Sequence, residues 1–307
     1  MMDSTYTNEV HATKPRDAHE LLRIFESAED LPTLPEVALK LQKVVDDPRS
    51  NAKSVAKMIE DDPALATKVL KMVNSVFYAP AHGVKITQLQ PAIARLGLIA
   101  VSNIALSTSV FQAFSRCQMP VFDRREFWRH SITVGIITSV LYDYSVDTIE
   151  QHITRDMAHL AGIVHDMGKI LFERYANAEF HKAIQNAKMA DIPVVKEECR
   201  LIGMGHDEAG AWLASKWQLG PDIQAVVRWH HDPFLCPDDE FKPLAKLVHM
   251  ADYICHNQKL GDSGNPNPGY DQRVREELKL TPEKIGDLMG VVEVEAANSE
   301  VLLSLSE

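Results

Sequence analysis

Apolar residues recur at helical spacing from about residue 19 to residue 258, and this periodicity constrains the fold more than any other feature. One example is the series Val37, Leu41, Val44 and Val45, which follows a proline suited to a first helical turn. The sequence contains no stretch of strict apolar–polar alternation and no Asn-Gly or Asp-Gly hairpin between alternating runs. The pattern therefore predicts an all-α protein.

Proline, glycine and changes of composition divide this helical chain. Pro63 disfavours helix at the residue before it and opens the next helix. The segment RCQMPVFDRR (116–125) is predicted to be a junction between subdomains, GDSGNPNPGY (261–270) a loop, and 281–290 a short helix before an acidic end. We therefore expect four parts: a disordered tail (1–18), an N-terminal helical subdomain (19–116), a second helical subdomain (117–258), and a loop with an acidic tail (259–307).

Composition excludes several classes of protein. Hydrophobic residues make up 45% of the 307 residues, which is enough for a folded core. The net charge of −11, with no cluster of Lys and Arg, disfavours binding to nucleic acid. The four cysteines form no CxxC pair and are predicted to be reduced thiols. The N-terminus lacks the apolar stretch of a signal peptide, and no apolar run reaches the roughly 20 residues of a membrane span, so we expect a cytoplasmic protein with no membrane partner.

The strongest local signal is the segment GIVHDMGKILF, which contains adjacent His165 and Asp166. Neighbouring helical residues point about 100° apart, so this pair could bind two metal ions, or one ion from its side. Lys169 falls on the same face as Asp166 and could neutralise a phosphate oxygen, and Gly168 is expected to let the chain loosen beneath the site. The same segment also fits a helix C-terminus with an ordinary His-Asp pair.

Other histidines and carboxylates are grouped in the second half, which holds ten of the thirteen histidines. Glu126 and His130 lie one helical turn apart, as a carboxylate–imidazole metal pair requires. Asp252 lies within an otherwise apolar helix; it is either solvated or, if buried, paired or metal-bound. His249 and His256 flank it and form a rival local site. The predicted metal ligands are Glu126, His130, His165, Asp166, His206, His230, His231 and Asp252.

This set of nitrogen and oxygen donors suits divalent ions such as Fe, Mn, Zn or Ni. Eight ligands exceed what one tetrahedral ion needs, so the sequence predicts two or three ions. A water bridging such ions has a lowered pKa and becomes a nucleophile at neutral pH.

The region from about 120 to 258 resembles the HD superfamily of metal-dependent phosphohydrolases, because it carries His130, the His165-Asp166 doublet, His206, His230-His231 and Asp252 in that family's order. Glu126 and Lys169 match positions used by the HD-GYP branch, which hydrolyses cyclic di-GMP. From about residue 20, the segments LPTLPEVALKL, IEDDPALATKVLKMVNSVFY and ITQLQPAIARLGL resemble HDOD (HD-related output domain) proteins of bacterial signalling. The resemblance implies an HD-like helical bundle, which would be the metal-binding subdomain, preceded by a helical HDOD subdomain.

The sequence also departs from these relatives. The segment after the paired histidines reads DPFLCPDDEF and lacks a Gly-Tyr-Pro element, so hydrolysis of cyclic di-GMP is not supported. Many HDOD proteins have lost the HD ligands, whereas this chain keeps the full set.

Two hypotheses about function follow. The first is a metal-dependent phosphohydrolase acting on a phosphorylated small molecule or nucleotide, with Asp166 and Lys169 as catalytic residues. The second is a catalytically inactive signalling adaptor that works by binding a signalling protein partner. The HDOD half, in which we identify no chemistry of its own, favours the second.

Overall fold

The computed structural model describes residues 17–45, 50–75, 78, 85–114, 123–145 and 153–297. Within these ranges the chain is helical and contains no strand, which confirms the all-α prediction. The predicted tail (1–18) and the predicted junction (116–125) lie mostly outside the described residues. In the described part, no single helix is long and apolar enough to cross a membrane; Leu89–Leu96 and Leu98–Phe114 pass that test only as a pair, bent by 119°.

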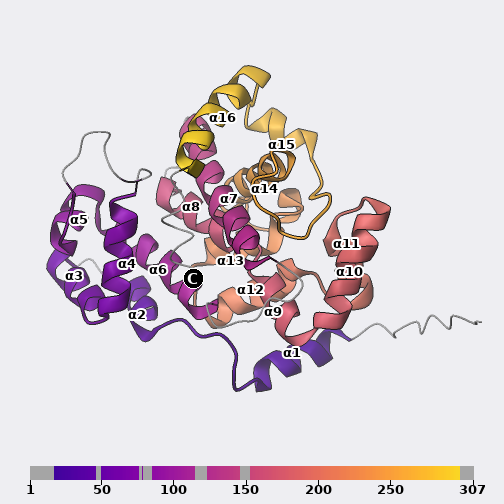
Figure 1. Cartoon of the computed structure of the whole chain (residues 1–307), viewed down its shortest axis with the longest axis horizontal. Coiled ribbons are helices and arrows are strands. Elements are labelled where there is room, and N and C mark those ends of the chain that lie inside the picture. Colours follow the sequence, from indigo (N-terminus) through magenta and orange to yellow (C-terminus); the bar gives the residue numbers. More distant parts are fainter. Residues whose placement is uncertain are drawn as a thin grey trace, which may run out of the picture.

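The first lobe contains five helices, which lie on the left of Figure 1. They are α2 (Glu36–Val45), α3 (Ala52–Glu60), α4 (Pro63–Val73), α5 (Leu89–Leu96) and α6 (Leu98–Phe114). Local sequence determines where α3 and α4 begin. The Asn51 side chain accepts from the Ser54 backbone N–H while the Asn51 backbone N–H donates to the Ser54 hydroxyl, which forms a capping box. The Asp62 side chain caps α4 by accepting from the Leu65 N–H at 3.0 Å, and Pro63 occupies the first turn.

The second lobe is built around α7 (Arg124–Ser145), which packs against α8 (Arg155–Val164) and α14 (Lys242–Asn257). Side chains on all sides of α7 are buried, as expected for a central helix. Around these three lie α9 (Gly168–Tyr175), α12 (His206–Lys216), α13 (Pro221–Trp229) and the 3₁₀ turn η2 (Pro233–Leu235), with the hairpin of α10 (Asn177–Ala190) and α11 (Val194–Leu201) at one side (Figure 1).

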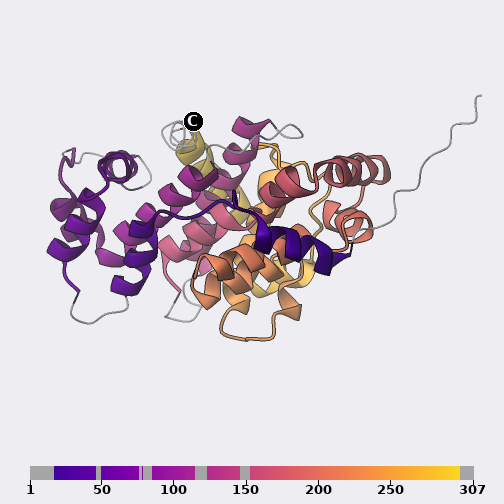
Figure 2. The ribbon, with the colours of Figure 1, turned by 90° about the horizontal axis from the view of Figure 1, so that it is seen from below.

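The first helix, α1 (Ala18–Ser27), packs on α9 of the second lobe. The Phe25 ring lies 5.3 Å from that of Trp212 and 5.5 Å from that of Tyr175. The segment after the helix continues this contact, because the Trp217 indole N–H donates to the Pro32 carbonyl at 2.9 Å. Figure 2 shows α1 (indigo) beside the second lobe, apart from α2–α6. Residues 18–32 thus lie outside the lobe that contains the rest of the predicted N-terminal subdomain.

The C-terminal region begins with an irregular loop at 261–270, as predicted, followed by α15 (Gln272–Glu277) and α16 (Pro282–Ala297). The helix predicted over 281–290 therefore ends seven residues too early. Its apolar face continues beyond 290, because Leu288 and Val292 are both fully buried and α16 packs on α7. Glutamate tolerates the helical conformation well, so the acidic residues near the end of α16 do not terminate it.

Candidate metal centre

Seven of the eight predicted ligands converge at the centre of the second lobe. They are His130 (α7), His165 (the C-cap of α8), Asp166 (the turn before α9), His206 (the first residue of α12), His230 (the C-cap of α13), His231, and Asp252 (α14). Except for the partly exposed His231, these residues are at most 5% exposed. Each of these residues lies on the inward face of a helix, at a helix end or in the turn next to one. The fold thus brings together residues that are far apart in sequence.

The ligands form two groups with the Asp166 carboxylate between them. The first group is His130, His165 and Asp252, and the second group is His206, His230 and His231. Asp166 Oδ2 faces the first group, at 3.8 Å from His130 Nε2 and 3.4 Å from His165 Nε2. Asp166 Oδ1 faces the second group, at 3.1 Å from His206 Nε2 and 3.9 Å from His230 Nε2. The two oxygens of one carboxylate therefore serve different histidine groups.

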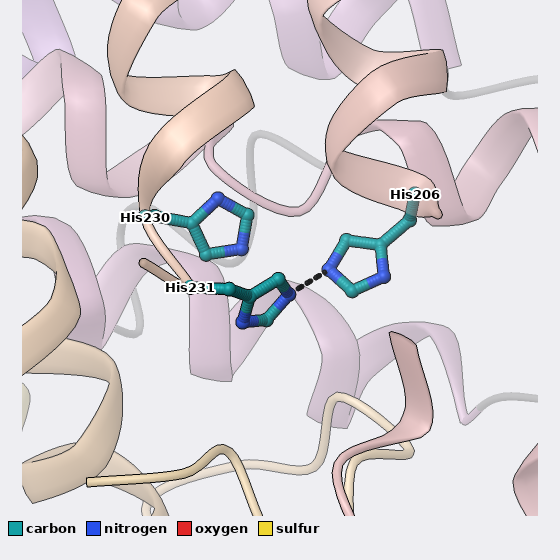
Figure 3. A group of neighbouring side chains, drawn as sticks. All are labelled: His206, His230 and His231. Atoms are coloured by element: carbon teal, nitrogen blue, oxygen red, sulfur yellow. Dashed lines mark hydrogen bonds between the residues drawn. The ribbon is translucent and has the colours of Figure 1, made fainter. Parts of the chain in front are cut away.

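The geometry within each group fits a divalent ion. In the first group, Asp252 Oδ1 lies 3.2 Å from His130 Nε2 and 3.9 Å from His165 Nε2. In the second, His231 Nε2 lies 2.9 Å from His206 Nε2. Figure 3 shows these two rings directed toward one another. Ligand atoms bound about 2.1 Å from a tetrahedral ion lie about 3.4 Å from one another. The observed separations bracket this value, so each group could hold one ion with little rearrangement.

Three buried nitrogen atoms in the centre also fit a bound cation. The Nε2 atoms of His130, His165 and His230 are shielded from solvent and, among the described residues, have no hydrogen-bond partner. An unpaired polar atom costs about 1–3 kcal/mol when it is buried, so such atoms are rare in folded proteins. One cation in each group would satisfy all three.

In three of these histidines the other ring nitrogen, Nδ1, already forms a hydrogen bond within the protein. His165 Nδ1 lies 2.7 Å from the Gly162 carbonyl oxygen, and His230 Nδ1 lies 2.9 Å from that of Val227. His206 Nδ1 lies 2.6 Å from Oε2 of Glu198. Because these oxygens accept from an N–H at Nδ1, they fix the orientation of each ring and leave Nε2 directed at the centre. Metal-binding histidines use this arrangement.

Burial and neighbouring charges shift the pKa of several of these groups. Burial alone would raise the pKa of Asp166, but the neighbouring His165 and Lys169 cations hold that pKa well below its ordinary value. Burial lowers the pKa of His230 and His231, and the charges of nearby histidines lower it further. His206 behaves differently: burial opposes its charge, but the Glu198 charge together with hydrogen bonds to Asp166 and Glu198 raises its pKa to about 9.

Lys169 and Gly168 both have close contacts in the centre. The Lys169 ammonium donates to Asp166 Oδ2 at 2.6 Å, and the side chain is 1% exposed. The regular helix is interrupted by a turn at 165–167, just before Gly168. Gly168 itself begins α9, and a Cβ there would lie 1.9 Å from the His206 carbonyl oxygen. Its role is therefore close packing of α9 on α12, not the loosening that the sequence suggested.

Other sequence-predicted residues are placed elsewhere. The Glu126 carboxylate pairs with Arg129 Nη1 at 3.2 Å, and the structure does not bring it into either group; its role as a ligand stays a prediction. His249 uses both nitrogens structurally, because Nδ1 lies 2.8 Å from the His230 carbonyl oxygen and Nε2 accepts from the Asp271 N–H. The rival site around Asp252 is therefore not formed, since Asp252 faces His130 and His165.

Sequence reasoning missed two residues that support the ligands. Glu198 is fully buried and holds both the backbone N–H and the Nδ1 of His206. A signal for it was present: Glu198 lies between Val194 and Leu201 on the buried stripe of α11, where a carboxylate needs a partner. Cys255 Sγ lies 3.5 Å from His130 Nδ1, but its place in an apolar helix gave no comparable signal.

The helical fold surrounds a His/Asp cluster, and comparison with known sequences identifies the family. The HDOD domain family matches residues 31–233, and the chain belongs to that family. Its match ends before Asp252 and the loop at 261–270. A curated relative, an uncharacterised protein of Treponema pallidum, is 25% identical over 228 residues, which is 74% of this chain and 42% of the relative. The chain thus spans less than half the length of this relative.

Solved structures share the same fold. An HDOD domain protein of unknown function from Geobacter sulfurreducens superposes with a TM-score of 0.75 at 25% identity, covering 92% of this chain and 97% of that chain. A protein from Shewanella amazonensis, provisionally named a phosphohydrolase, gives a TM-score of 0.67 at 23% identity and covers 93% and 96%. A signal transduction protein from Marinobacter aquaeolei, also provisionally named, gives 0.71 at 19% identity and covers 94% and 64%. Because the last two structures are less than 25% identical to this chain, they show only that the fold is shared.

Proposed function

We propose that this chain is a metal-dependent phosphohydrolase of a bacterial signalling system, with a dinuclear centre. The observation that carries the proposal is the position of Asp166, whose two carboxylate oxygens face separate histidine groups. A bridging carboxylate of this kind is what two ions sharing one site require. The provisional names of two Shewanella amazonensis structures, a phosphohydrolase and a metal-dependent phosphohydrolase, are consistent with it.

Each ion would have four protein ligand atoms. His130, His165, Asp252 and Asp166 Oδ2 would hold the first, and His206, His230, His231 and Asp166 Oδ1 the second. This count favours two ions over three, and the mixture of imidazole and carboxylate suits Fe, Mn, Zn or Ni. Such ions, when bound, activate water as a nucleophile and polarise phosphate oxygens.

The protein's own groups would orient the reaction. Asp166 is ionised because its pKa is held low, so it is ready to ligate on both sides. The Lys169 ammonium lies within the centre, 2.6 Å from Asp166 Oδ2, and is positioned to stabilise negative charge on a phosphate oxygen. Burial of this cation beside its carboxylate strengthens the electrostatic interaction. We assign catalysis to Asp166 and Lys169, and the substrate class is a phosphorylated small molecule or nucleotide.

Turnover measurements test this proposal. Purified protein reconstituted separately with Mn, Fe, Zn or Ni is assayed with p-nitrophenyl phosphate and bis(p-nitrophenyl) phosphate. We expect at least one metal to support hydrolysis, Asp166→Asn to abolish it, and Lys169→Gln to lower kcat. The control is His181→Ala, which changes an exposed histidine on α10 outside the centre. Hydrolysis that survives Asp166→Asn unchanged would show that the activity arises elsewhere.

A second candidate function is a signalling adaptor that binds a protein partner without turnover. The burial of the centre favours it, because six of the converging ligands are at most 5% exposed and ions held by them could serve stability alone. This alternative predicts bound metal, a lower Tm after metal removal, and no hydrolysis of either substrate. The turnover assay therefore separates the two functions.

A further inference from the structure

A pocket of about 370 Å³ lies against His130, between α10, the end of α14 and the loop at 261–266. Its walls include His130, Lys188, His256, Lys259, Ser263 and Asn265. Binding sites for small molecules begin at about 300 Å³, so the pocket is large enough for part of a metabolite. It touches a metal-centre histidine, but none of the other converging ligands lines it.

The lining of this pocket is cationic in a protein of net charge −11. Lys188 and Lys259 are both exposed, and neither pairs with a carboxylate within the described ranges. His256 adds an imidazole from α14. The one carboxylate in the lining, Asp262, already accepts from the Gly264 N–H at 2.8 Å. Two unpaired ammonium groups facing one cavity attract an anion.

Asn265 supplies a buried donor in the same wall. The residue is 4% exposed, and its Oδ1 accepts from the Val194 N–H at 3.1 Å. That bond assigns the orientation of the amide and leaves Nδ2, which is buried and has no hydrogen-bond partner among the described residues. Because an unpaired buried donor is costly, this amide is suited to an oxygen atom of a ligand.

The wall that carries these groups is anchored to the metal centre. The Asp262 N–H donates to the Glu126 carbonyl at 3.0 Å, one turn before His130 on α7. Gly261 packs directly on His130, because a Cβ at this glycine would lie 2.3 Å from the His130 backbone nitrogen. The bond between Asn265 and Val194 connects the same loop to α11, the helix that carries Glu198. The pocket is thus held in fixed register with the ligands.

We propose that this pocket binds a second, non-reacting phosphate of the substrate. This inference rests on the proposed function, in which the first phosphate lies at the metal centre. A substrate with two phosphate groups could then span the two sites, with one at the ions and the other against Lys188, Lys259 and Asn265. The substrate class is accordingly a bisphosphate or a nucleoside polyphosphate.

Binding measurements with pyrophosphate and inorganic phosphate test the pocket without relying on turnover. Calorimetric titrations are run on metal-loaded protein and on protein in EDTA, at low and high salt. We expect Lys188→Glu/Lys259→Glu to weaken pyrophosphate binding at least tenfold in both forms. Asn265→Asp keeps the acceptor for Val194 but removes the unpaired donor, and we expect it to weaken binding as well. The control, Lys53→Glu/Lys57→Glu, makes the same charge change on two exposed lysines of α3 and leaves binding unchanged.

Different experimental results would overturn the phosphate pocket and the proposed hydrolase function. Equal pyrophosphate affinity in the wild type and Lys188→Glu/Lys259→Glu, with metal content unaltered, overturns the pocket and leaves the metal centre intact. Absence of any pyrophosphate binding by the wild type overturns it too. Binding in EDTA that depends on the two lysines supports the pocket, even if the chain proves to bind no metal and the proposed function is lost.

Discussion

Glu198 Oε2 lies 2.6 Å from His206 Nδ1, and neither side chain is exposed to solvent. The same oxygen accepts the His206 backbone N–H at 2.9 Å, so one carboxylate determines both where α12 begins and which way the imidazole points. His206 Nε2 is thereby directed at Asp166 and His231. This connection explains how α11, which carries no predicted ligand, contributes to the metal centre.

Replacing Glu198 by glutamine tests that connection. Glu198→Gln keeps the size of the side chain but removes the charge, and support of a ligand histidine in this way contributes about 10–100-fold to metal affinity. We expect a loss of that size for the ion of the second group, measured by competition with a chelating dye. The matched control is Glu197→Gln, because the neighbouring Glu197 pairs with Arg200 and Asn186 away from the centre. Equal losses in the two variants would contradict this role for Glu198.

Substitution of Gly168 tests the packing of α9 on α12. A Cβ at Gly168 would overlap the His206 carbonyl oxygen, and both groups are backbone or attached to it, so the helices must move apart. We expect Gly168→Ala to reduce the free energy of unfolding by about 3 kcal/mol, the upper end for overpacked sites. Gly286→Ala in α16 meets no atom within 4 Å and should be neutral or stabilising by up to about 1 kcal/mol. Urea denaturation of both variants measures the difference, and similar stabilities would refute the packing role.

Stability should depend on acid pH through His159. Burial lowers the pKa of this histidine to about 3, from an ordinary value of 6.5. Between these values the unfolded chain binds the proton and the folded chain does not, so stability rises with pH and is lost as pH falls below 6.5. In EDTA, His159→Leu should reduce the slope of unfolding free energy against pH by about 1.4 kcal/mol per unit between about pH 4 and 6. An unchanged slope would show that His159 is not buried in its neutral form.

Metal affinity should rise with pH through His206. Because its pKa is about 9, the folded metal-free protein holds a proton there at neutral pH, and a metal must displace it. One displaced proton increases the apparent affinity about tenfold per pH unit below pH 9. Calorimetry in buffers of different ionisation enthalpy counts the protons released. Metal binding at pH 7 without proton release would contradict the ion pair between His206 and Glu198.

Helix positions were predictable where local chemistry determines them. Pro63 begins α4 where expected, and the polar loop at 261–270 interrupts the helices as predicted. The end of α16 was not predictable from composition, because acidic residues suggested a solvated tail whereas burial of Val292 against the second lobe extends the helix. The position of α1 was also not predictable from the sequence, because its contacts with Trp212 and Tyr175 join segments far apart in the chain.

The convergence of the ligands was predicted through the order of motifs, but the geometry around them was not. Spacing placed Glu126 one turn from His130, yet an ion pair with Arg129, three residues away, competes for its carboxylate. Backbone partners such as the Gly162 carbonyl have no sequence signature, because every residue carries one. At Gly168 the sequence suggested a flexible turn, whereas the structure shows a close approach between two helices. Both situations favour glycine, so the residue type alone does not distinguish them.

Elemental analysis of freshly purified protein tests the central claim most directly. The two groups have three residues each, and Asp166 gives each group a fourth ligand atom. We therefore predict close to two divalent ions per chain. This metal content should fall below one ion in Asp166→Ala and stay unchanged in His181→Ala. Replacement of His230 should remove the second ion and leave the first. A metal content near zero in the wild type, unaltered by Asp166→Ala, would contradict the dinuclear centre and the hydrolase built on it.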